Sequence, residues 1–406
     1  MFLPCFSVMM DSGVDILDSF CIIYGMCDYL TTPERGIVLS FEAIAAQFGI
    51  TAPIVEETEI HSGNINRTYL VTVQETAQTT KQYIFQRINT YVFKNPQAVM
   101  SNILKVSEHI KQKLLQQQGC YHRRVLSFLT TAEGEPYYYT GEHHFFRVYE
   151  FVDHATAYDM LRSAEQFGEA GRAFGEFQGW LSDFPADTLA EIIPDFHNTP
   201  VRYTAFKEAV EKDAAGRRAA AEAEIAFLLE REQACARIAQ ALQDGEIPCR
   251  VTHNDTKIIN ILFDDTTDRA ICVIDLDTVM PGTPLYDFGD AVRYGASTAR
   301  EDEPDLSKVS FDLAMYEQFT RGFIEGTNGL LSEAELDLLP HSALIMTLEL
   351  ATRFLADYLN GDVYFKTTSS EHNLIRARSQ IRLAQDIENK WEQLCAITAA
   401  CRGEKG

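Results

Sequence analysis

The alternation of apolar and polar residues divides the chain into a first part with the pattern of strands and a second part with the pattern of helices. Short runs rich in β-branched and aromatic residues predict strands at residues 55–61, 67–73, 81–87, 124–130, 135–140 and 145–152. Asn95-Pro96 opens a predicted helix that ends near residue 117, because proline suits the first helical position and one face is apolar. A shorter amphipathic helix is predicted at residues 40–48. These elements indicate a small lobe built on an antiparallel sheet.

The second part, after about residue 153, has the apolar spacing of helices. It predicts a helix at residues 164–182, one or more long helices within 203–243, and helices at 311–323, 335–358 and 374–397. We therefore expect an α+β fold of two lobes, a small antiparallel-sheet lobe at 41–152 and a larger, mainly helical lobe at 153–406. Residues 1–40 are expected to be a poorly ordered extension. An export signal or anchor is the disfavoured alternative, because the segment lacks a basic start.

A polar segment interrupts the helical part at residues 249–264. Apolar, strand-like residues flank its polar centre, which predicts a strand, a tight loop and a second strand. His253, Asp255 and Asn260 have the spacing of the protein-kinase catalytic loop, H-R-D-x-x-x-x-N, and Asp275 ends the next apolar run where the metal-binding Asp of a kinase follows. Each residue alone is unremarkable, but together they predict a phosphoryl-transfer site on a protein-kinase-like fold.

The residue types in this segment suit that chemistry. Asp255 is the candidate base, because a carboxylate near a substrate hydroxyl can accept its proton. Lys257 is predicted to hold the γ-phosphate as a point charge. His253, counted with the catalytic residues, is expected to brace the loop through hydrogen bonds.

Oxygen-bearing side chains nearby predict a metal site. Asn260 and Asp275 offer hard oxygen donors from different elements, which favours Mg²⁺ over zinc. Asp277 is interpreted as a substrate contact or a second metal ligand, and a cap on the following turn is the equal alternative. Asp287 is expected to stabilise the catalytic loop or to cap the helix after it.

The small lobe is expected to bind ATP. Residues 62–66 join two strands as a nucleotide-covering loop should, with Gly63 and Asn66 as candidates, although one glycine is a weak signal and an ordinary hairpin is the default. Arg87 ends the third strand where a kinase places its phosphate-binding Lys, and a surface Arg is the alternative. Backbone groups at about Glu150 and Val152 are expected to bind adenine.

Composition excludes several classes of partner. The net charge of −24 argues against nucleic-acid binding and against an anionic membrane surface. No apolar run approaches the roughly 20 residues of a membrane span. The nine cysteines are scattered and form no C-x-x-C pair, which favours reduced thiols and a cytoplasmic location. We expect a small-molecule substrate, and among oligomeric states a monomer is favoured.

With these residues in place, the chain resembles the aminoglycoside-phosphotransferase-like kinases, and within them most closely the bacterial N-acetylhexosamine 1-kinases. The likeness runs from about residue 55 to 397. Its most restrictive pieces are Thr-His-Asn-Asp-Thr-Lys at 252–257 and Arg-Phe-Leu-Ala-Asp-Tyr-Leu at 353–359. Further pieces lie at residues 66–71, 274–278, 287–290 and 294–298.

The resemblance implies ATP-dependent phosphorylation of the anomeric hydroxyl of N-acetylglucosamine or N-acetylgalactosamine, with retention of the anomeric configuration that was bound. It implies the base role for Asp255 and magnesium roles for Asn260 and Asp275. It also implies sugar contacts from Arg353 and Tyr364, although a plain ion pair of Arg353 with Asp357 is an alternative.

Two departures from the pattern of these relatives bear on the substrate. The relatives carry Gly-Asp-Gly-His before Ile-Asn, where this chain has His61-Ser62-Gly63-Asn64. A sugar contact there must come from Asn64 or be lost. Ile259 stands where an Asn is common beside Asn260.

A kinase for another small alcohol, such as an aminoglycoside, choline or homoserine, is the alternative enzyme. A catalytically inactive binding protein is disfavoured by the intact catalytic residues.

Overall fold

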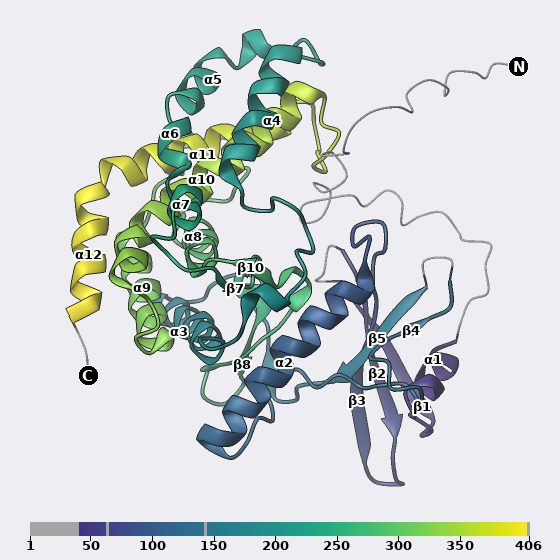
Figure 1. The fold of residues 1–406 in the computed structure, drawn as a ribbon. Coiled ribbons are helices and arrows are strands. Elements are labelled where there is room, and N and C mark those ends of the chain that lie inside the picture. The colour runs from purple at the N-terminus through teal and green to yellow at the C-terminus, as the bar shows by residue number, and fades with distance from the viewer. Residues whose placement is uncertain (1–39, 62–64, 142–143, 404–406) are drawn as a thin grey trace, which may run out of the picture.

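The protein consists of a sheet lobe and a helical lobe. A computed structural model describes residues 40–61, 65–141 and 144–403 (Figure 1). The sheet is antiparallel with strand order β1-β2-β3-β5-β4. The elements of the sheet lobe are α1 (Phe41–Gln47), β1 (Ile54–Ile60), β2 (Arg67–Gln74), β3 (Thr80–Arg87), α2 (Pro96–Gln118), β4 (Tyr138–Tyr139) and β5 (Phe145–Glu150). This arrangement confirms the predicted α+β fold with a small antiparallel-sheet lobe.

The helical lobe contains most of the chain and two small sheets, β10-β7 and β6-β8-β9. Its helices are α3 (Ala164–Trp180), α4 (Thr199–Lys212), α5 (Glu222–Leu229), α6 (Glu232–Cys235), α7 (Arg237–Gln243), α8 (Pro284–Gly295), α9 (Leu313–Thr327), α10 (Glu333–Asn360), α11 (His372–Asn389) and α12 (Trp391–Gly403). Its strands are β6 (Ala155–Thr156), β7 (Arg250–Thr252), β8 (Ile261–Asp264), β9 (Ala270–Val273) and β10 (Met280–Gly282). Single turns of 3₁₀ helix lie at Ala186–Thr188, Arg218–Ala220, Ile258–Asn260, Leu276–Thr278 and Leu306–Lys308.

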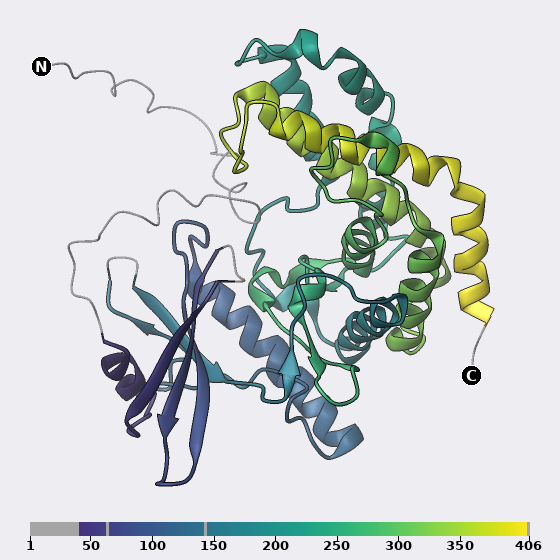
Figure 2. The same ribbon diagram turned by 180° about the vertical axis from the view of Figure 1, so that it is seen from behind.

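Helix α2 lies between the sheet and the helical lobe in both views (Figures 1 and 2). Asn95 begins it, since its side-chain oxygen accepts a hydrogen bond from the N–H of Ala98 at 3.0 Å. The buried Asn102 then joins the helix to the helical lobe. Its amide donates to the carbonyls of Ala190 and Val279, both at 2.8 Å, and accepts from the N–H of Ala190 at 2.9 Å. These bonds fix α2 against the helical lobe.

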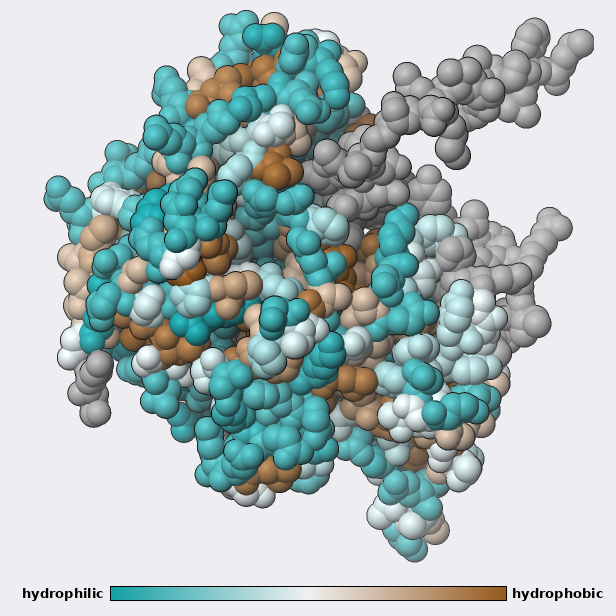
Figure 3. Space-filling model, in the orientation of Figure 1, coloured by the Kyte–Doolittle hydropathy of each residue, from teal (hydrophilic) through white to brown (hydrophobic). Residues whose placement is uncertain are grey.

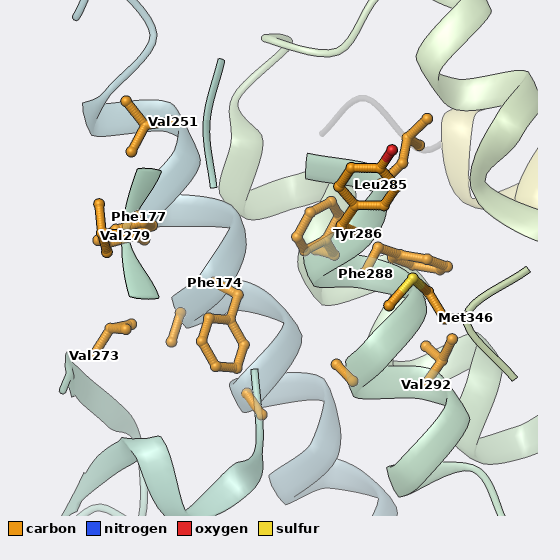
Figure 4. Close-up of a cluster of buried hydrophobic side chains, with 14 of the residues drawn as sticks. Phe174, Phe177, Val251, Val273, Val279, Leu285, Tyr286, Phe288, Val292 and Met346 are labelled. Atoms are coloured by element: carbon orange, nitrogen blue, oxygen red, sulfur yellow. The ribbon is translucent and has the colours of Figure 1, made fainter. Parts of the chain in front are cut away.

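Helices α3 and α9 approach each other more closely than side chains usually allow. Glycines on both helices make this approach possible. A methyl group at Gly175 would lie 2.3 Å from the carbonyl oxygen of Phe323, and one at Gly322 would lie 2.1 Å from that of Gly168. The closely packed α3 presents Phe174 and Phe177 to the core behind β7 and β9. Figure 4 shows these two rings in one cluster with side chains of β7, β9 and α8. The strands that carry the polar segment therefore rest on a tightly packed base.

Several predicted elements differ from the structure. Residues 124–130 form no strand in the structure beyond an isolated bridge between Phe128 and Tyr149, and the strand at 135–140 is reduced to Tyr138–Tyr139. Residues 203–243 form short helices rather than long ones, since Asp213 and Gly216 have positive φ and end the helical path. The predicted helix at 374–397 is divided into α11 and α12 at Lys390. Residues 1–39 of the predicted extension lie outside the described residues.

Polar residues cover most of the face shown in Figure 3, and apolar residues occur there in small separate patches. Among the described helices, none is both long enough and apolar enough to cross a membrane.

We predict that Gly175→Ala destabilises the protein by about 1–3 kcal/mol, the usual range for overpacking, because the added methyl group collides with the backbone of α9. Gly168→Ala in the same helix is the matched control, since its methyl group would lie 3.3 Å from the nearest atom. Both substitutions raise the helix propensity of α3 by the same amount, so this gain cancels when the two variants are compared. Chemical denaturation measures the difference, and equal stabilities of the two variants would contradict the close packing.

Candidate active site

The loop between β7 and β8 is held from behind by His253. Its ring is fully buried and lies edge-on to Phe174 and Phe177, with centroids 5.7 and 5.8 Å away. Nδ1 accepts from the N–H of Asp255 at 3.3 Å, so Nε2 carries the hydrogen and donates to the carbonyl of Ile274 at 3.0 Å. Both nitrogens are thus engaged in bracing the loop, as the sequence predicts, and this ring does not line either cavity described below.

Asp287 of α8 fixes the direction of the same loop. Its buried carboxylate accepts from the N–H groups of His253 at 2.9 Å and Asn254 at 2.7 Å, and from the amide of Gln178 at 2.8 Å. Asn254 has a positive φ of 68°, an uncommon conformation for a residue other than glycine. Burial raises the pKa of Asp287, while the two N–H groups favour its charged form. The predicted role of Asp287 in stabilising this loop agrees with these contacts.

Asp255 stands at the front of the loop with its two carboxylate oxygens differently engaged. One oxygen pairs with Nζ of Lys257 at 2.8 Å. The other accepts from Nδ2 of Asn260 at 3.0 Å, and the same amide donates to the carbonyl of Asp255 at 2.8 Å. Since Nδ2 of Asn260 points to Asp255, the amide oxygen remains as its metal-binding atom. The structure thus brings together three of the residues predicted from spacing.

A cavity of about 410 Å³ lies in front of this loop, between the sheet and the helical lobe. Its polar side chains come from β2, β3 and β5 on one side and from residues 255–278 on the other. They include Asn66, Gln86, Arg147, Asp255, Lys257, Asn260, Asp275 and Asp277. Apolar residues, among them Ile60, Ile84, Phe128, Val152 and Leu262, line its remainder. The cavity has the size and the mixed lining of a small-molecule site.

The carboxylates of this cavity favour a bound cation. Asp275 has a positive φ of 59° at the end of β9 and lines the cavity together with Asn260. Burial, with the nearby charges of Asp277 and Asp255, raises the pKa of Asp275 to about 7. A divalent cation would offset this repulsion, and the amide and carboxylate oxygens are the donors that Mg²⁺ accepts. The residues present therefore fit the predicted magnesium ion.

A buried ion pair joins the two lobes inside the cavity. Nη1 of Arg147 on β5 donates to one oxygen of Asp277 at 2.5 Å, and both residues are 3% exposed. Nδ2 of Asn66 donates to the other oxygen at 2.6 Å, and Oδ1 of Asn66 accepts from the N–H of Asn89 at 3.0 Å. Both oxygens of Asp277 are thus engaged within the protein, which favours a structural role over the substrate contact, second metal ligand or turn cap expected from sequence.

Arg87 does not fit its expected role in this cavity. Ile84 and Gln86 of β3 line the cavity, whereas Phe85 packs on the other face of the sheet against Phe41 of α1. Because side chains alternate along a strand, Arg87 lies on the face of Phe85, away from the cavity. The arginine that the cavity does contain is Arg147, which comes from the neighbouring strand.

The other residues predicted for nucleotide binding have different positions. Val152 lines the large cavity, as expected. The carboxylate of Glu150 accepts instead from Nζ of Lys81 at 2.7 Å, so a contribution of Glu150 to ligand binding rests on its backbone. Gly63 and Asn64 lie outside the described residues.

A second, smaller cavity of about 20 Å³ lies on the other side of Asp255. Its lining contains charged groups of both signs: Asp255, Asp290, Arg293, Glu349 and Arg353, with His197 and Asn254. The predicted sugar-binding residue Arg353 therefore shares a cavity with the candidate base. Tyr364 lies behind it and accepts from Nη2 of Arg353 at 3.1 Å. The carboxylate of Asp357 accepts from the N–H groups of Tyr364 and Phe365, and these bonds offset its burial.

A comparison with known protein families supports the assignment of this loop to a phosphoryl-transfer protein. Residues 56–320 match the model of the phosphotransferase enzyme family, and this segment is more than half of the chain. The chain belongs to the phosphotransferase enzyme family. The match spans both lobes and includes the loop with His253, Asp255 and Asn260.

Solved structures share the fold of this phosphotransferase at low sequence identity. A microcompartment-associated aminopropanol kinase is 17% identical, with a TM-score of 0.52, and covers 85% of this chain and 94% of its own. An aminoglycoside phosphotransferase from Alicyclobacillus acidocaldarius is 14% identical, with a TM-score of 0.51 and coverages of 92% and 98%. A choline kinase from Cryptosporidium parvum is 13% identical, with a TM-score of 0.51 and coverages of 85% and 92%. These likenesses bear on the fold, which is the protein-kinase-like one predicted.

Sequence reasoning missed two features of the phosphotransferase site. Arg147 had a signal, since it is the only charged residue within the apolar strand 145–149. His197 and Glu349 form a buried pair at the small cavity, with Nδ1 and Oε1 3.1 Å apart. They are about 150 residues apart in sequence, so no local spacing could have indicated their contact.

We predict that Arg147→Met destabilises the protein by about 3–5 kcal/mol, because it leaves the carboxylate of Asp277 buried without its counter-charge. The double variant Arg147→Met/Asp277→Leu should recover most of that loss. Arg162→Met, which removes an exposed partner of Asp268, is the control and should cost at most about 1 kcal/mol. Unfolding free energies measure all three. A double variant as unstable as Arg147→Met would show that the pair is not the origin of the effect.

Proposed function

We propose that this phosphotransferase is an ATP-dependent kinase that phosphorylates the anomeric hydroxyl of N-acetylhexosamines. The observation that carries the proposal is the position of Asp255, which lines both cavities. A phosphoryl donor in the large cavity and an acceptor that places one of its polar groups in the small cavity would meet at this carboxylate. Phosphoryl transfer depends mainly on such positioning and on charge stabilisation.

The large cavity suits ATP and magnesium. Its volume of about 410 Å³ and the apolar side chains near Val152 are compatible with an adenine ring. Asn260 and Asp275 would hold Mg²⁺, which when bound neutralises phosphate charge and polarises the phosphoryl group. Lys257 and Arg147 contribute positive charge to a protein that is otherwise strongly acidic. Because Asp255, Asp275 and Asp277 share this cavity, the bound Mg²⁺ would supply the rest of the positive charge that an anionic nucleotide needs.

Asp255 is held ready to receive a proton. Lys257 and Asn260 fix its two oxygens, so the carboxylate is oriented before the acceptor binds. The anomeric oxygen of the sugar would attack the γ-phosphorus, the bond from that phosphorus to the oxygen of ADP would break, and the hydroxyl proton would pass to Asp255. No bond to the anomeric carbon breaks in this step, so the sugar 1-phosphate retains the configuration of the bound anomer.

The lining of the small cavity supports an uncharged acceptor with several hydrogen-bonding groups. Arg293 and Arg353 place two positive charges there, beside carboxylates and an imidazole. The three carboxylates of this lining, Asp255, Asp290 and Glu349, are already engaged by Lys257, Arg293 and His197. A cationic acceptor would therefore lose its hydration and meet the like charge of Arg353, which disfavours its binding. Choline, aminopropanol and aminoglycosides, which the structurally similar proteins named above are named for, are cations. A neutral sugar can instead pair with donors and acceptors of both kinds. The choice of N-acetylhexosamine rests on the resemblance at residues 252–257 and 353–359.

A substrate panel tests this proposal. The purified protein is incubated with Mg-ATP and, separately, with N-acetylglucosamine, N-acetylgalactosamine, choline, homoserine and an aminoglycoside, and ADP and phosphorylated product are measured. We expect 1-phosphate from at least one N-acetylhexosamine and turnover at least 10-fold slower with the amine-bearing alcohols. Formation of neither ADP nor 1-phosphate with both sugars would reject the sugar assignment. Turnover with a cation alone would favour the alternative acceptor class.

We predict that Asp255→Asn lowers kcat at least about 100-fold, the low end of the contribution of a general base, while the affinity for Mg-ATP changes little. The amide keeps the shape of the side chain but cannot accept the proton. Asp159→Asn, at an exposed position, is the matched control. Steady-state kinetics and calorimetric nucleotide titration separate the two effects. An unchanged kcat would remove Asp255 from the proposed role.

A further inference from the structure

We infer that His197 and Glu349 form a positioning pair in which Nε2 of His197 accepts a hydrogen bond from an acceptor hydroxyl other than the one that is phosphorylated. The inference rests on the proposed function in so far as the acceptor is a polyhydroxy compound. His197 lies directly before α4, and Glu349 lies on α10. The pair would make His197 a residue that determines specificity rather than one that takes part in the chemical step.

Glu349 fixes which nitrogen of His197 carries the hydrogen. Its carboxylate is 1% exposed, with Oε1 3.1 Å from Nδ1 of His197 and Oε2 accepting from the hydroxyl of Thr199 at 3.1 Å. Burial opposes ionisation, but contact with His197 and the charges of Arg202 and Arg353 outweigh it and lower the pKa of Glu349. An ionised carboxylate only accepts hydrogen bonds, so Nδ1 of His197 is the protonated nitrogen. In the neutral ring, Nε2 then presents a lone pair.

Nε2 of His197 is the atom that points to a ligand. The residue is 8% exposed and lines the small cavity, yet among the described residues Nε2 has no hydrogen-bond partner. The rings of Phe196 and Tyr286 lie against the imidazole, with centroids 4.4 and 5.1 Å away, and restrict its rotation. A buried acceptor without a partner is unfavourable, so a ligand group that donates to it is selected over one that cannot.

The size and surroundings of the small cavity define the group that fits. A volume of about 20 Å³ has room for one group the size of a water molecule, such as a hydroxyl. Glu349 and Arg353 are one turn apart on α10, and Met346 and Leu350 complete the stripe that faces the cavity. The same helix face thus places the hydroxyl subsite and the arginine next to Asp255. An acceptor anchored in this subsite has its reacting hydroxyl held at a fixed distance from the base.

A deoxy-sugar series with matched variants tests the subsite. The wild-type protein, His197→Phe and His341→Phe are assayed with N-acetylglucosamine and its 3-, 4- and 6-deoxy analogues. In the wild type, one analogue should show at least a 10-fold lower kcat/KM than the parent sugar, mainly through KM. In His197→Phe the parent should fall to the level of that analogue, so that their ratio approaches one. His341→Phe replaces a different histidine, on α10, whose Nδ1 has no hydrogen-bond partner among the described residues, and this variant should keep the wild-type ratio.

Two control measurements show whether His197→Phe is still folded and still binds nucleotide. Thermal unfolding and Mg-ATP affinity of His197→Phe should stay close to the wild type, which excludes misfolding as the cause. If every deoxy analogue keeps its wild-type ratio in His197→Phe, the subsite is refuted while the kinase assignment stands.

The tautomer of His197 is tested without any sugar. Long-range ¹⁵N–¹H correlation spectra of the free protein should show Nδ1 protonated and Nε2 unprotonated, and Glu349→Gln should change this pattern. A ring protonated on Nε2, either alone or together with Nδ1, would overturn the inference whichever acceptor is phosphorylated. Absence of 1-phosphate from the wild type with its parent sugar would refute the proposed function instead, so the two failures are distinct.

Discussion

The site depends on one buried carboxylate, that of Asp287, which accepts hydrogen bonds from two successive backbone N–H groups. Two adjacent N–H groups of an irregular loop cannot be left unpaired in the interior, and no sheet or helix ladder satisfies them there. Asp287 does so from α8, and the contact holds Asn254 in its left-handed conformation. This turn of the backbone directs Asp255 away from the core and toward the two cavities. Without it, the spacing of His253, Asp255 and Asn260 would not produce a common site.

The electrostatics of the large cavity follow from a second constraint, the burial of several carboxylates close together. Asp255, Asp275 and Asp277 repel one another in a region of low dielectric, and the protein offsets part of this with Lys257 and Arg147. Arg147 neutralises Asp277, so Asp275 remains as the carboxylate with the strongest demand for a cation. The net charge of −24 therefore says little about the site, because the local balance is set by these few buried groups.

Sequence predictions were most accurate where the contacting residues lie close together in the chain, and least accurate where the contact depends on residues far apart in sequence. His253, Asp255, Asn260 and Asp275 lie within 23 residues of one another, so their spacing alone predicted their meeting. The prediction for Arg87 gains no support from the large cavity, because it depended on which face of β3 the side chain takes, and only the register with β2 and β5 decides that. The strand expected at 124–130 failed for a similar reason, since strand-like residues form a strand only where a neighbouring edge pairs with them.

The two halves of the site differ in how they are encoded. On the proposed phosphate side, the base and the candidate metal ligands come from one continuous segment, residues 251–278, whose strands and tight turns leave little freedom for substitution. The proposed acceptor side is assembled from the segment before α4, the loop at Asp255, α8 and one face of α10. Substitutions on that helix face can change the size and charge of the small cavity without disturbing the contacts of Asp287 or Asn260. A family of kinases can therefore keep its phosphoryl-transfer machinery while the acceptor changes, and the determinants of the acceptor are to be sought on α10 rather than in the catalytic loop.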